Sequence, residues 1–193
     1  MENPPSASND YFHNFLCYEN LPGILIPQKV YLESTLYQQP KEIRSIAMFY
    51  RHEIVGVTVS ARPGATLGVS LAEVLAFDRK AMTEARNYLD TALASLENQP
   101  FKFVLKWPGC AEYVSEYSKH GVKGVWTAAR LARAVALAVQ TFYEAKVFAK
   151  LVDRSSPEPD WTPDRIPFDK LYLLELRQIN PRMFQPVLYY DAD

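Results

Sequence analysis

The longest helix-forming stretch of the chain is residues 124–153, which contain no proline. Alanine, the best helix former, occurs eight times in it, beside leucine, arginine, glutamine and lysine. At about 100° per residue, the apolar positions that share one face are Leu131, Val135, Val139 and Phe142. Arg130, Arg133 and Glu144 lie on the opposite face. The pattern therefore predicts a long amphipathic helix whose apolar stripe faces a core.

The apolar stripe changes sides in the last turns of this helix. Phe148, Leu151 and Val152 lie under the polar face of the first half, and Lys146 lies under its apolar face. One straight helix cannot bury both edges against one core. We therefore predict a bend or break between Glu144 and Lys146, or last turns that leave the main core. Loops or the C-terminal strands are expected to cover the new edge. The alternative cover is a partner chain, for which Phe148, Leu151 and Val152 would be the binding residues.

Period-two alternation of apolar residues, bounded by turn residues, predicts the strands. They are a hairpin over 43–61 and single strands near 24–37, 101–107, 170–179 and 187–190. A second long helix is predicted over 70–97, because Ser70 and Glu73 have the spacing of a capping box. The chain is thus expected to be an α+β fold, in which a mostly antiparallel sheet packs against the helices 70–97 and 124–153.

Prolines and small polar residues mark the remaining segments. Residues 1–10 are predicted to be a flexible arm, residues 11–193 a single domain, and the proline-rich stretch 155–168 a surface connection. Pro186 predicts that the last strand lies at an edge of the sheet, because proline cannot donate to a strand ladder. Cys110–Lys119 is expected to be a short helix or a turn.

Composition narrows the class of protein. The 193 residues are 48% hydrophobic and 22% charged, with a net charge near −1. This balance is ordinary for a folded domain and argues against non-specific binding to nucleic acid or to a charged membrane. Two cysteines exclude a disulfide framework, and the sequence has neither a secretory signal nor a run of about 18 apolar residues. The expected setting is therefore intracellular, in the cytoplasm.

Candidate catalytic chemistry is sparse. Cys110 and His120 are a candidate nucleophile and base for a small enzyme, and His52 with a carboxylate is a second candidate pair. No CxxC or HxxxH motif occurs, so neither a metal site nor a cofactor is predicted. Glu175 interrupts an apolar strand. Arg177, two positions later, is expected to pair with it on an exposed strand face.

Four basic residues are the candidates for an anion or nucleic-acid contact. Lys102 and Lys106 alternate with aromatic side chains in residues 101–107, and Arg130 and Arg133 lie near the start of the long helix. Basic side chains interleaved with aromatic ones are typical of surfaces that bind single-stranded nucleic acid. Solvated charge on each element is the simpler interpretation, so nucleic-acid binding is the alternative and not the leading expectation.

Residues 54–107 run from a hydrophobic strand through a proline turn and a helix that opens SLAEVLAF to the strand FKFVLKW. This order resembles the core of matrix proteins of negative-strand RNA viruses, and it covers under a third of the chain. The near-neutral charge departs from the basic, membrane-facing character of those proteins. The resemblance implies a structural protein. The leading expectation is a non-enzymatic protein-interaction or assembly module that associates with itself.

Overall fold

The structure is a computed structural model that describes residues 23–28, 44–47, 68–76, 100–117, 128–155, 159–180 and 182–192. Its strands are β1 (Ile24–Leu25), β2 (Arg44–Ala47), β3 (Val69–Ser70), β4 (Phe101–Leu105), β5 (Tyr113–Tyr117), β6 (Leu171–Asn180) and β7 (Met183–Tyr190). Its α-helices are α2 (Leu71–Ala76), α5 (Ala128–Tyr143) and α6 (Ala145–Leu151). Two short 3-10 helices are η1 (Pro159–Trp161) and η2 (Phe168–Lys170). These elements confirm the predicted α+β class.

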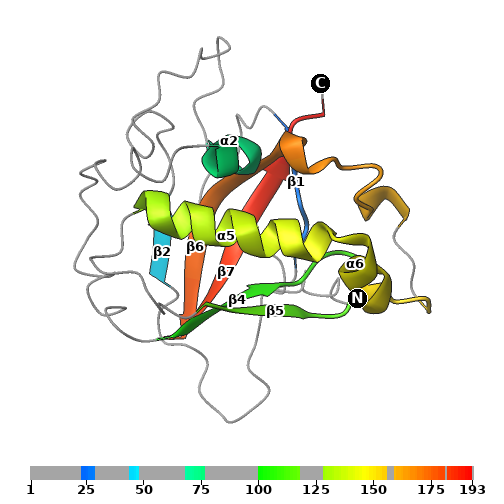
Figure 1. Cartoon of the computed structure of the whole chain (residues 1–193), viewed down its shortest axis with the longest axis horizontal. Helices are drawn as coiled ribbons and strands as arrows, with labels where there is room; N and C mark the ends of the chain where they lie inside the picture. The colour runs from blue at the N-terminus through cyan, green and yellow to red at the C-terminus, as the bar shows by residue number, and fades with distance from the viewer. Residues whose placement is uncertain are drawn as a thin grey trace, which may run out of the picture.

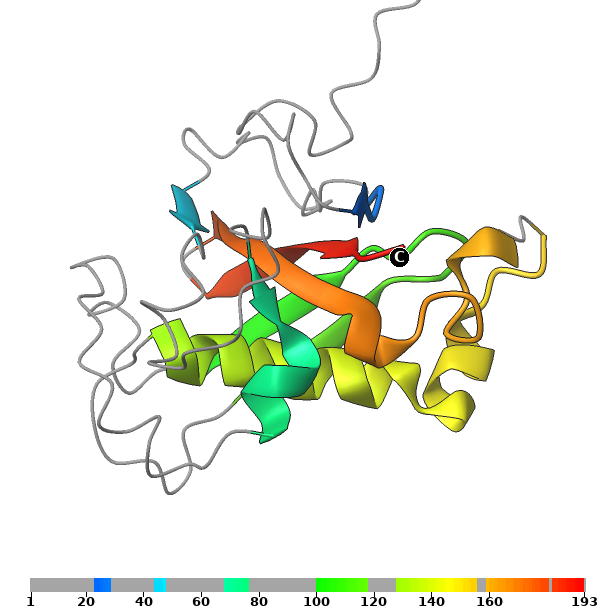
Figure 2. The same ribbon diagram turned by 90° about the horizontal axis from the view of Figure 1, so that it is seen from above.

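One mixed, mostly antiparallel sheet contains the seven described strands. Five of them follow the order β2-β6-β7-β4-β5, while β1 pairs with β7 and β3 pairs with β6. The long strands β6 and β7 pair antiparallel at the centre, and β4 joins β7 in a parallel pairing. Helices α2 and α5 lie against the same face of this sheet (Figures 1 and 2). The predicted arrangement of a mostly antiparallel sheet against helices is confirmed.

The main core lies between that face of the sheet and α5. The four positions of the predicted apolar stripe are all fully buried: Leu131, Val135, Val139 and Phe142. On the sheet side, the ring of Phe101 meets those of Phe103 and Phe184 edge to face, with centroids 5.2 and 5.7 Å apart. Each such apolar side chain contributes roughly 1.5–3 kcal/mol when it is fully buried. Burial of the stripe therefore anchors α5 on the sheet.

The long helix is interrupted at Glu144, as the change in its apolar stripe predicted. Glu144 lies between α5 and α6 with φ −59° and ψ 127°. This ψ is extended, so the helical hydrogen-bond ladder stops there. The Glu144 carbonyl accepts from the N–H groups of Val147 and Phe148, which starts the first turn of α6. After the break, α6 leaves the axis of α5 (Figure 1). Phe148 and Leu151 of α6 are partly buried against the main core.

The predicted start of the second helix is confirmed, because the Glu73 N–H donates to Ser70 Oγ at 3.3 Å. Strands near 101–107 and 170–179 are present as β4 and β6. The described part of 155–168 contains η1 and no α-helix. Much of what was predicted lies outside the described residues: the rest of the helix 70–97, of the hairpin 43–61 and of the strand 24–37, and the arm 1–10.

Two predictions about the sheet are wrong. Residues 113–117 form the strand β5, which pairs antiparallel with β4, and not a helix or turn. Their burial alternates along the strand, which is the pattern of a half-buried sheet edge. The last strand is longer than 187–190 and is not at an edge, because β7 lies between β6 and β4 with Pro186 buried inside it. How the sheet accommodates this proline depends on a buried glutamine, Gln28.

Candidate functional site

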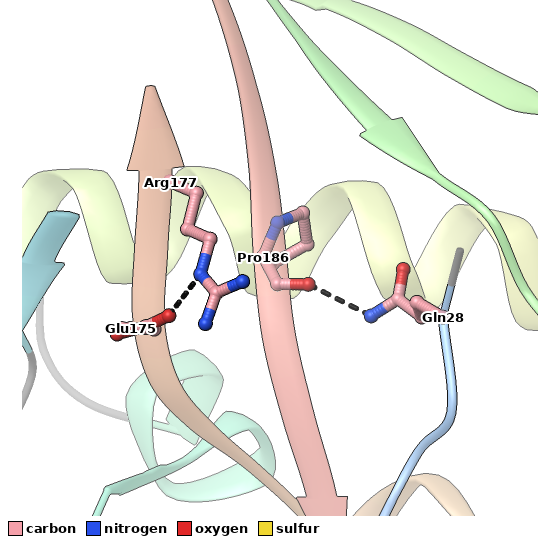
Figure 3. Close-up of polar contacts among 4 residues, drawn as sticks. All are labelled: Gln28, Glu175, Arg177 and Pro186. Carbon is pink, nitrogen blue, oxygen red and sulfur yellow. Dashed lines mark hydrogen bonds and ion pairs between the residues drawn. The ribbon is translucent and has the colours of Figure 1, made fainter. Parts of the chain in front are cut away.

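A buried ion pair lies on the face of the sheet opposite α5 (Figure 3). Glu175 and Arg177, both on β6, are 0% and 1% exposed. The Nε of Arg177 donates to a carboxylate oxygen of Glu175. Gln185, which lies opposite Arg177 on β7, is also buried. The predicted pairing of Glu175 with Arg177 is confirmed, but the prediction of an exposed strand face is wrong.

A β-bulge at Leu174 explains on which face of the sheet the pair lies. Leu173 lies opposite Leu188 on β7, whereas Glu175 lies opposite Val187. Two residues of β6 thus span one step of β7, which reverses the alternation of side chains along β6. Leu173 and Leu188 belong to the core under α5, and Val187 belongs to a second apolar cluster. Glu175 therefore projects to the face opposite Leu173, although simple alternation predicts that both share one face.

A buried glutamine bridges two strands of the same sheet. In the described residues, the parallel strands β4 and β7 pair only near their first residues. Beyond that point Gln28, 1% exposed, lies between them. Its Nε2 donates to the Pro186 carbonyl at 2.7 Å (Figure 3). Its Oε1 accepts from the Lys106 N–H at 3.2 Å. The glutamine side chain thus takes the place of a backbone hydrogen bond between β7 and β4.

The hydrogen bond from Gln28 to the Pro186 carbonyl explains how the central strand β7 accommodates a proline. The N and C=O of one residue leave a strand on the same side. Because the Pro186 carbonyl points to Gln28, the Pro186 nitrogen also points away from β6. Proline therefore removes no hydrogen bond from the β6–β7 ladder. Sequence reasoning missed Gln28, since a single glutamine carries no signal that its amide will be buried between two strands.

Ion pairs hold both candidate lysines, of which Lys102 lies on β4 and Lys106 directly follows it. Lys102 Nζ lies 3.8 Å from Glu116 Oε2, and Lys106 Nζ lies 2.6 Å from Glu112 Oε2. Lys102 and Glu116 are directly opposite in the β4–β5 register. Opposite charges across a strand pair stabilise the pairing by up to about 1 kcal/mol. The two lysines therefore contribute to holding β5 on β4.

The candidate arginines lie on the other side of the sheet, on α5. Arg133 Nη1 donates to the carbonyls of Val74 and Leu75 in α2, both at 3.0 Å, and so joins the two helices. Arg130 lies about one turn earlier and is half-buried. The structure does not bring the two lysines and the two arginines onto one surface. Their contact with an anion or a nucleic acid stays a prediction.

The chain itself covers part of the apolar edge that Phe148, Leu151 and Val152 form in the last turns of the long helix. The ring of Phe148 packs edge to face against the ring of Phe142 on α5, with centroids 5.6 Å apart. The Ala111 N–H donates to the Leu151 carbonyl at 2.6 Å, and Cys110 and Val152 form an antiparallel bridge. Phe148, Leu151 and Val152 remain half-buried. The expectation that the chain's own segments lie over this edge is therefore supported, and binding of a partner there stays a prediction.

Burial raises the pKa of the Cys110 thiol to about 11. The thiolate is the nucleophilic form, so a catalytic cysteine needs a lowered pKa. Burial of Cys110 raises its pKa instead, because it disfavours the charged thiolate. His52 and His120 lie outside the described residues, so the pair Cys110 with His120 and the pair of His52 with a carboxylate both stay predictions.

We expect Cys110 to react slowly with alkylating reagents at pH 8 in a Cys17→Ser variant. A thiol whose pKa is about 11 rather than the ordinary 9.0 has roughly a hundredfold less thiolate at that pH. The rate with iodoacetamide should rise steadily with pH up to about 11. The same variant in concentrated urea is the control. Equal rates in the folded and unfolded chain would contradict the prediction.

Strand β5 forms one end of the sheet (Figure 1). Among the described strands it pairs with β4 alone. Val114, at the second position of the strand, is 42% exposed, and it lies opposite the buried Val104. The outer edge of such a strand carries N–H and C=O groups that can pair with another chain. The signal for this edge was the alternation Tyr113, Ser115, Tyr117, which sequence reasoning did not use.

Comparison of the chain with models of protein families, with curated proteins and with solved structures finds no match. Within the described residues, no group of three or more His, Cys, Asp or Glu side chains is placed to hold a metal ion. No helix in the described part of the chain is both long enough and apolar enough to cross a membrane.

Proposed function

We propose that this protein is a non-enzymatic protein-interaction or assembly module that associates with itself. The observation that supports the proposal is the edge of β5, where the exposed Val114 lies in a strand that pairs on one side with β4. Edge strands that proteins keep from associating usually carry an outward lysine, a proline or a bulge. The five residues of β5 contain neither lysine nor proline, and their register with β4 is continuous. The one charged side chain of the strand, Glu116, is paired with Lys102 of β4.

Two further features of the sequence are consistent with this proposal. The order of elements in residues 54–107 resembles viral matrix proteins, and such structural proteins are an example of the assembly class that we propose. The cysteine usage and the mild net charge favour a cytoplasmic setting. Neither feature names a partner, so the proposal is limited to association between copies of the chain.

The 193-residue chain should show a concentration-dependent mass. We expect the weight-average mass from size exclusion with light scattering to rise from the monomer value between about 5 µM and about 1 mM, because a small interface associates weakly. Val114→Lys should hold the protein at the monomer mass, since an outward lysine on an edge strand opposes pairing. Leu137→Lys is the matched control, because Leu137 is an exposed leucine on α5, away from the edge of β5. A monomer mass at every concentration would overturn the proposal.

A further inference from the structure

We propose that the partner of the β5 edge is β5 of a second copy, paired antiparallel about Ser115. This inference rests on the proposed self-association and adds the surface, the register and the symmetry. A two-fold axis at Ser115 sets Ser115 opposite its own copy, Val114 opposite Glu116, and Tyr113 opposite Tyr117. It is the one register in which all five residues of β5 face β5 of the partner copy.

Charge favours this register over its neighbours. A shift to Val114 opposite Val114 would bring Glu112 of one copy opposite Glu116 of the other. A shift to Glu116 opposite Glu116 would bring two like charges face to face. Like charges directly opposite in a strand pair are destabilising. With Ser115 at the axis, each Glu116 meets a valine and stays beside Lys102 of its own copy, 3.8 Å away.

The side chains on the two faces also suit this pairing. Val114, 42% exposed, would be covered by the methylene groups of Glu116 of the second copy. On the α5 face, Tyr113 and Tyr117 are half-buried, and the Tyr117 ring stacks on Phe101 with centroids 5.4 Å apart. The register sets Tyr113 of each copy opposite Tyr117 of the other, and cross-strand aromatic pairs stabilise antiparallel strands. The product is one sheet continuous through both copies.

Disulfide trapping tests the register directly. Residues directly opposite in an antiparallel pair have Cα atoms about 4.5–5.5 Å apart, which is within the range that a disulfide spans. In a Cys17→Ser, Cys110→Ala background, we expect Ser115→Cys to form a covalent dimer under mild oxidation. Val114→Cys and Glu116→Cys should each remain mostly monomeric alone. An equimolar mixture of these two variants should form covalent dimer, at least about tenfold more than either alone.

Other outcomes separate the register from self-association itself. If the wild-type mass rises with concentration but Ser115→Cys does not cross-link, the register is overturned and the proposed function stands. If Val114→Cys alone cross-links as well as the mixture, the strands pair in the shifted register. If neither the mass nor any cross-link shows a dimer, both proposals fail. Each cysteine variant is first required to match the wild-type circular dichroism spectrum, so that misfolding is not scored as loss of pairing.

Discussion

Replacing Arg177 by methionine is expected to lower the free energy of unfolding by about 3–5 kcal/mol. The guanidinium is 1% exposed and pairs with Glu175, which is 0% exposed. Without Arg177, the carboxylate would be left as a buried charge with its ion-pair partner removed. Urea unfolding followed by tryptophan fluorescence measures the loss, and Glu175→Met should cost a similar amount because it removes the ion-pair partner of the buried guanidinium.

The double variant Glu175→Met with Arg177→Met should be more stable than either single variant. Two apolar side chains of similar volume often replace a buried ion pair at little or no cost, because neither charge then needs to leave water. The coupling energy in the double-mutant cycle should thus be large. The half-exposed pair Lys102–Glu116 is the matched control, for which we expect less than about 1 kcal/mol of coupling. Additive losses in the buried pair would contradict this account.

Gln28→Met is expected to destabilise the fold by about 2–4 kcal/mol, because two backbone groups lose their partner. Methionine has a similar shape but can neither donate to the Pro186 carbonyl nor accept from the Lys106 N–H. The sheet would then contain an unsatisfied carbonyl and an unsatisfied N–H between β7 and β4. Hydrogen exchange should also become faster at the Lys106 amide. Gln140→Met on the exposed side of α5 is the control, with an expected change below about 0.5 kcal/mol.

Gln28→Glu distinguishes hydrogen bonding from simple packing at the same position. A carboxylate there would face the Pro186 carbonyl, and burial would raise its pKa above the unfolded value near 4.3. Stability that depends on the protonated carboxyl is present at low pH and is lost as pH rises through the raised pKa. We therefore expect this variant to lose more stability at pH 7 than at pH 5, relative to the wild type. A pH-independent loss would favour a packing defect instead.

Local pattern correctly predicted several elements of this protein. The apolar stripe of α5, the break at Glu144 and the capping contact at Ser70 all follow from residue spacing along one helix. The alternation in β4 and β6 likewise predicted two strands. Each of these features depends on neighbours within a few positions, so propensity and periodicity contain the information. The candidate pairing of Glu175 with Arg177 was found for the same reason.

Features that depend on which strands become neighbours were decided by the tertiary structure. The bulge at Leu174 exists only in the pairing of β6 with β7, and it places Glu175 on the face opposite Leu173. Pro186 suits a central strand only because Gln28, 158 positions away in the chain, approaches its carbonyl. The edge at β5 exists because the sheet order ends there. The sequence by itself thus determined α5, the start of α2, the strands β4 and β6, and the break between α5 and α6. Pairing of distant segments decided burial, register and the exposed edge, because each depends on contacts that no local spacing encodes.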